Sequence, residues 1–177
     1  GDYHLNYNHF APYYGLFSSN HIEQAIPCHV SMLAQQERGE YYSKAVCGIE
    51  DGIMLPVGAG PLGIETTRRN QLMEKHRAHW ISEGSVQDEG LFYGQKSNSS
   101  YAIVNMAMHF YTTYDSEIAA LYCPFVKGVA SFWENYLTFE DGRYVIYNDA
   151  IHEGTIGTVN PILSLGLVRL VMQTAID

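Results

Sequence analysis

Residues 115–136 read DSEIAALYCPFVKGVASFWENY and carry the clearest fold signal in the chain. Their apolar residues recur at three- and four-residue spacing for about five turns, so this stretch predicts one long amphipathic helix capped by Asp115 or Ser116. A similar stripe precedes it, beginning behind Asn98 or Ser99 and ending at Tyr114. Only residues 112–115 join the two stripes, and such a short connection predicts an antiparallel helical hairpin.

Further helices are predicted towards both ends of the chain. Asn20 to Glu37 has helical spacing, and Pro27 within it either bends the helix or marks its true start. A short helical piece is expected over 40–46. The last helix is expected to start at Asn160-Pro161 and to run to Ile176. Because that helix is apolar on nearly every side, it is expected to be buried all round.

The remaining segments are predicted from their turn residues. Gly48 to Gly63 contains five glycines and two prolines and predicts a long ordered loop, with room for one short strand. A weak periodicity indicates a helix over 65–80, and 81–97 is expected to be a loop. Asp141-Gly142 between β-forming residues predicts a small β-hairpin over 138–147. The expected fold class is therefore mainly all-α, with this one hairpin.

Composition narrows the possible functions. A chain of 177 residues with 46% hydrophobic and 16% charged residues is typical of a single globular domain. Its net charge of −9 gives no basic face for nucleic acid. The apolar runs fall short of the roughly 18 residues that predict membrane insertion. Scattered Cys28, Cys47 and Cys123 form neither a zinc ligand set nor a disulfide framework, and no metal or cofactor is expected.

Aromatic residues make up 13% of the chain, and several lie in loops rather than at helical core spacing. Flat apolar rings with polar edges suit the C–H faces of sugar rings, although such rings can equally pack loops onto a core. The candidates for sugar contact are Tyr13, Tyr14, Trp80, Phe92 and Tyr93.

Two segments place polar residues among aromatic or glycine residues, 5-LNYN-8 and 149-DAIHEG-154. A carboxyl held against apolar surface keeps its proton more readily, which makes Glu153 the candidate general acid. Asn6 and Asn8 alternate along one stretch and could orient a water or a sugar hydroxyl. Turn or cap roles for the asparagines, and a plain surface role for Glu153, are the alternatives. His152 and Asp149 could bind a hydroxyl beside the acid.

Taken in order, these segments resemble the helical catalytic domain of glycoside hydrolase family 95, the inverting α-L-fucosidases, and more broadly the six-hairpin (α/α)6 glycosidases. The matching features are the Asn6-Tyr7-Asn8 motif in an aromatic setting, a helical hairpin, the Asp141-Gly142 turn, the segment ending at Glu153, and a final helix. Asn-Asp-Ala-Ile-His before Glu153 and glycine after it depart from the family pattern. The chain therefore resembles a divergent member.

The resemblance implies an incomplete (α/α)6 toroid of helical hairpins, with residues 1–177 as one partial catalytic domain truncated at its C-terminus and also at its N-terminus. It implies Glu153 as general acid, and Asn6 and Asn8 as the pair that holds the attacking water. The general base is expected beyond residue 177, so the isolated chain is expected to be inactive. The substrate would be an oligo- or polysaccharide, and the parent protein periplasmic or secreted.

Several alternatives stay open at this point. A glycoside phosphorylase of the same toroid would replace the carboxylate base by phosphate. A helical interaction module without catalysis is favoured if Glu153 proves to be a solvated surface group. Self-association is expected through apolar surface that the missing helices would otherwise cover.

Overall fold

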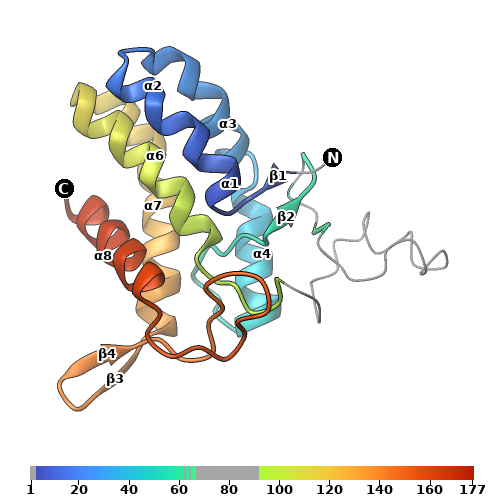
Figure 1. Cartoon of the computed structure of the whole chain (residues 1–177). Helices are drawn as coiled ribbons and strands as arrows, with labels where there is room; N and C mark the ends of the chain where they lie inside the picture. The colour runs from blue at the N-terminus through green and yellow to red at the C-terminus, as the bar shows by residue number, and fades with distance from the viewer. Residues whose placement is uncertain (1–2, 62, 64, 67–91) are drawn as a thin grey trace, which may run out of the picture.

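The computed structural model describes residues 3–61, 63, 65–66 and 92–177, and helices dominate it (Figure 1). The N-terminal helices are α1 (Tyr7–Phe10), α2 (Tyr14–Ser18), α3 (Ile26–Leu33) and α4 (Gln36–Cys47), with 3₁₀ turns η1 (Ala11–Tyr13) and η2 (Ile22–Ala25). The later helices are α6 (Asn98–Thr113), α7 (Ser116–Tyr136) and α8 (Ile162–Ile176). The strands are β1 (Tyr3–His4), β2 (Gly58–Ala59), β3 (Thr138–Glu140) and β4 (Arg143–Val145). The mainly helical class is confirmed.

Helices α6 and α7 form the predicted helical hairpin. Tyr114 ends α6 with a φ of +51°, in the left-handed region. Asp115 then caps α7, because its carboxylate accepts hydrogen bonds from the backbone N–H groups of Glu117 and Ile118 at 2.8 and 3.3 Å. The predicted stripe of α7 faces the core through Phe125, Val129 and Trp133, which are fully buried.

Helix α8 packs on both α6 and α7 (Figure 1). It buries one stripe, Ser164, Leu167, Val168 and Val171, while Ile162 and Ile176 are 82% and 80% exposed. The prediction of a helix buried all round was therefore wrong. The main packing partners of α8 are α6 and α7, and its apolar residues outside the buried stripe stay partly or largely exposed.

The predicted helix over 20–37 is broken into η2, α3 and the start of α4. Pro27 lies in the first turn of α3, where its missing N–H costs no hydrogen bond, so the proline marks a start. Helix α4 runs straight through Gly39 and ends at Gly48, whose φ is +70°. The short helical piece expected over 40–46 is thus the second half of a longer helix.

The predicted loop after Gly48 is confirmed, but residues 52–59 are buried throughout. It passes between α4 and α7, where Ile53 N donates to Gly128 O at 2.9 Å and Met54 N donates to Gly39 O at 3.1 Å. A Cβ at Gly128 would lie 2.3 Å from Ile53 Cδ1, and one at Gly39 would lie 2.8 Å from Ile53 Cγ2. The two helix glycines therefore leave the space that Ile53 fills.

Two short antiparallel pairs complete the fold. Strand β2, at the end of the buried loop, pairs with β1 through Tyr3↔Ala59 and His4↔Gly58, which fixes the start of the chain against the core. Strands β3 and β4 form the predicted hairpin, with Asp141 and Gly142 at φ +48° and +76° in its turn. Of the helix expected over 65–80 only Glu65 and Thr66 are described, and Glu65 forms an antiparallel bridge with Ala59 instead of a helical turn. The rest of that helix and most of the loop expected over 81–97 lie outside the described residues.

Candidate active site

The N-terminal motif forms the start of α1. Asn6 is 3% exposed, and its Oδ1 caps the helix by accepting a hydrogen bond from Asn8 N at 3.0 Å. Its Nδ2 is buried and has no hydrogen-bond partner among the described residues. The side chain of Asn8 is exposed on the first turn. Asn6 therefore caps the helix and keeps an amide N–H group without a partner among the described residues. Asn8 faces solvent.

Aromatic rings surround this helix start. The ring of His9 lies 5.5 Å from that of Tyr3 and 6.0 Å from that of Tyr13. Burial raises the pKa of Tyr13, and burial, with smaller effects of Tyr101, Tyr7 and Cys28, raises the pKa of Tyr14 to about 12. Both hydroxyls therefore stay protonated at neutral pH, and both side chains are partly exposed.

The segment 92–96 lies between the start of the chain and the loop over residues 149–158. The ring of Phe92 meets that of His4 edge-on at 4.8 Å, and Tyr93 is 38% exposed. Trp80, the remaining aromatic candidate, lies outside the described residues.

A small pocket lies against this segment. Phe92, Tyr93 and Lys96 line it together with Tyr42 and Pro56. Its volume of about 10 Å³ is no more than one water molecule needs, so it does not admit a sugar ring in this arrangement.

Glu153 lies at the tip of a loop that is closed at its neck. Asp149 N donates to Thr158 O at 3.1 Å, and Thr158 N donates back to Asp149 O at 2.9 Å. At the tip, Thr155 N donates to His152 O at 3.3 Å, which puts Glu153 and Gly154 at the centre of a turn. Gly154 has a φ of +68° there.

Glu153 and His152 are both exposed. The apolar setting expected for the Glu153 carboxyl is not formed by the part of the chain that the structure describes. A substrate can reach this carboxyl without any movement of those residues.

Asp149 is fully buried behind the loop. Its Oδ1 accepts hydrogen bonds from Lys96 N at 3.2 Å and Ala150 N at 2.8 Å, and its Oδ2 accepts one from Ser164 Oγ at 2.5 Å. With its oxygens used inside the protein, Asp149 supports the loop instead of lining a sugar site, which corrects the role expected for it. Sequence reasoning missed its partners Lys96 and Ser164, because neither stands in a recognisable motif.

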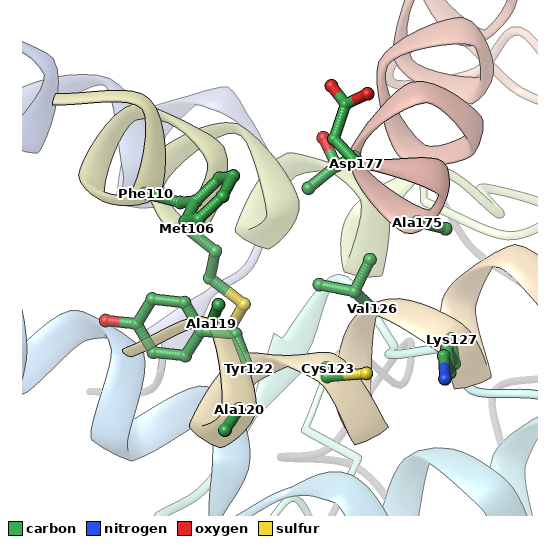
Figure 2. Close-up of a pocket in the computed structure, with 11 residues that line it drawn as sticks. Met106, Phe110, Ala119, Ala120, Tyr122, Cys123, Val126, Lys127, Ala175 and Asp177 are labelled. Carbon is green, nitrogen blue, oxygen red and sulfur yellow. The ribbon is translucent and has the colours of Figure 1, made fainter. Parts of the chain in front are cut away.

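A separate apolar groove of about 250 Å³ lies between α6, α7 and the end of α8. Figure 2 shows Met106 and Phe110 of α6 facing Tyr122 and Val126 of α7 across it, with Asp177 at its edge. No candidate residue of the sequence analysis lines this groove. Its walls are mainly apolar, and Asp177 is the carboxylate among its lining residues.

No family model, curated protein or solved structure matches this chain. Within residues 3–61 and 92–177 and the few described between them, no cluster of three or more His, Cys, Asp or Glu is arranged to hold a metal ion. None of the helices described is long and apolar enough to cross a membrane.

Proposed function

We propose that this chain forms part of the active site of an inverting glycoside hydrolase that acts on a glycan, within an (α/α)6 toroid of helical hairpins. Glu153 is the general acid, and Asn6 and Asn8 hold the attacking water. The proposal starts from the resemblance to the α-L-fucosidases of family 95. It is supported by one structural observation, the contact of segment 92–95 with both candidate segments.

On one side, the ring of Phe92 packs on His4, two residues before Asn6. On the other side, Gln95 Nε2 donates to Ile151 O at 3.3 Å, two residues before Glu153. The two polar segments, far apart in the sequence, therefore flank the same short stretch, and Figure 1 shows the orange-red loop beside the green stretch that leads into α6.

The chemistry fits the available groups. An inverting enzyme protonates the leaving oxygen from one side of the sugar and delivers a water from the other, with its two carboxyl groups about 6.5–9.5 Å apart. The Nδ2 of Asn6, buried and without a partner in the part of the chain that the structure describes, is a donor that a water oxygen would satisfy. The resemblance assigns the second carboxylate to the sequence after residue 177.

The exposure of Glu153 favours one rival, a helical interaction module without catalysis. The two functions differ in what they bind. A glycoside hydrolase domain binds sugar at residues 6–8, 92–93 and 153, whereas an interaction module gives no sugar binding at all.

The test is isothermal titration calorimetry of the chain with L-fucose, an α-L-fucosyl oligosaccharide and a panel of unfucosylated oligosaccharides. We expect binding of at least one of them, weakened about tenfold by Phe92→Ala, since loss of an aromatic–sugar contact is of the order of 1.4 kcal/mol. Phe139→Ala removes an equally large ring, 63% exposed on the β3–β4 hairpin, and should leave the affinity unchanged. Absence of binding by the whole panel, or equal losses in both variants, contradicts the proposal.

A further inference from the structure

We propose that Lys96, Asp149 and Ser164 form a buried clasp that positions the loop carrying Glu153. The role of Glu153 as acid rests on the proposed function, but the clasp itself does not. Lys96 and Asp149 are positioning residues here, because they act on the loop and not on substrate.

Lys96 is only 7% exposed, which is unusual for an ammonium group. Its Nζ donates to Gly94 O at 2.8 Å and to Asn148 O at 2.6 Å, and lies 5.3 Å from the centre of the Tyr136 ring. Burial lowers the pKa of Lys96, while Cys47 and Asp149 act in the opposite direction. A buried ammonium is tolerated only when it is hydrogen-bonded, so these carbonyl contacts account for its place.

The carbonyl of Asn148 is informative, because Asn148 has a φ of +51°. Asparagine adopts this left-handed region more readily than other non-glycine residues do, although at some cost in backbone free energy. The bond from Lys96 helps to hold this conformation where the chain turns into the loop.

Asp149, the second member of the clasp, accepts three hydrogen bonds with its carboxylate. It accepts from Lys96 N in the segment before α6, from Ala150 N in the loop itself and from Ser164 Oγ on α8. Thr158 Oγ1 also donates to Asp149 O at 2.8 Å, which closes the neck. These bonds tie the neck of the loop to the segment before α6 and to α8.

The same segment fixes the rest of the loop. Gln95 Nε2 bonds to Ile151 O, and a Cβ at Gly94 would lie 3.2 Å from Ile156 Cγ1, so glycine allows the close approach of the loop. Because Phe92 and Tyr93 directly precede Gly94 in this segment, the clasp sets the position of Glu153 relative to the aromatic pair proposed to contact sugar.

The experiment measures cleavage of the native chain after Glu153 by a glutamate-specific protease, with the product identified by mass spectrometry. Lys96→Met leaves the two carbonyls without their buried donor. We expect it to speed cleavage at Glu153–Gly154 about tenfold, since loss of a hydrogen bond to a buried charge favours local opening by that order. The matched control is Lys127→Met, at an exposed lysine of α7, which should cleave at the native rate.

Two further variants separate positioning from general destabilisation. Lys96→Arg keeps a charged donor and should restore most of the resistance to cleavage, a rescue that a loss of core packing would not show. Ser164→Ala removes only one bond to Asp149 and should give a smaller increase, about threefold. If Lys96→Met fails to fold, the cleavage rate of Ser164→Ala tests the clasp by itself.

Cleavage after Glu153 at the native rate in both Lys96→Met and Ser164→Ala would overturn the clasp. So would equal acceleration in Lys96→Met and Lys127→Met. No sugar enters this assay, so a failure of the proposed hydrolase function leaves its result unaffected, and the reverse also holds.

Discussion

The ring of His4 meets the ring of Phe92 edge-on, with centroids 4.8 Å apart and an interplanar angle of 79°. The contact joins β1, which leads directly into Asn6, to the segment that holds the Glu153 loop through Gln95 and Lys96. The relative position of the proposed water-holding asparagines and the proposed acid therefore depends on it.

A double-mutant cycle tests this contact. His4→Ala and Phe92→Ala should each destabilise the chain, and the double variant should be destabilised by less than their sum. The coupling free energy expected for an aromatic pair is about 0.5–1.5 kcal/mol, measured by urea unfolding. Strictly additive effects would show that the N-terminus and residue 92 are energetically independent.

Two glycines inside helices should respond in opposite directions to alanine. Gly128→Ala places a Cβ 2.3 Å from Ile53 Cδ1, and because Ile53 is 1% exposed the clash cannot be relieved into solvent. We expect a loss of about 1–3 kcal/mol. Gly166→Ala meets nothing within 4 Å on α8 and should gain about 0.5–1 kcal/mol from helix propensity. Thermal unfolding gives both values, and equal effects would contradict the threading of the 52–59 loop between α4 and α7.

The buried pair His29 and His109 predicts that the folded chain loses stability as the pH falls. His29 of α3 is 2% exposed, and neither of its ring nitrogens has a hydrogen-bond partner among the described residues. It faces Phe17 of α2, His109 of α6 and Tyr122 of α7, at ring-centroid distances of 6.3, 5.4 and 5.0 Å. Burial, and secondarily His109, lowers the pKa of His29 from 6.5 to about 4. Burial also lowers the pKa of His109, with Asp115 opposing.

Because the native pKa of His29 lies below its unfolded value, the unfolded chain takes up the proton first as the pH falls. The stability contributed by neutral His29 is complete above about pH 6.5 and is lost between there and pH 4, by about 3 kcal/mol in total. His29→Phe keeps a ring and should flatten the decline in urea-unfolding free energy over this range. His21→Phe, at an exposed histidine, is the control and should follow the native curve. Identical curves for native chain and His29→Phe would refute the assignment.

The sequence predicted the structural features that depend on residues close together in the chain. The carboxylate of Asp115 caps α7, and Asp141-Gly142 makes the hairpin turn, because both depend on neighbours within a few residues. The predicted helical piece began at residue 40, whereas α4 begins at Gln36 and includes Gly39, a glycine that leaves room for the distant Ile53. The burial of Asp149 depends on partners at positions 96 and 164, which spacing in the sequence does not reveal. Asn6 caps a helix, as one of the alternatives considered for it expected, and its Nδ2 has no partner among the described residues. Its role in holding a water stays a prediction.

In the proposed hydrolase, Asn6, Asn8 and Glu153 surround one sugar site. The most direct measurement is the NMR spectrum of the chain with ¹⁵N-labelled backbone and asparagine side chains, titrated with the sugar that binds most tightly. We predict that the side-chain amide signals of Asn6 and Asn8 and the backbone amides of Phe92 and Glu153 shift together with one dissociation constant, while those of Asn135 on α7 do not move. Shifts confined to residues of the apolar groove, such as Cys123 and Ala175, or shifts at Glu153 without any at Asn6 and Asn8, would contradict it.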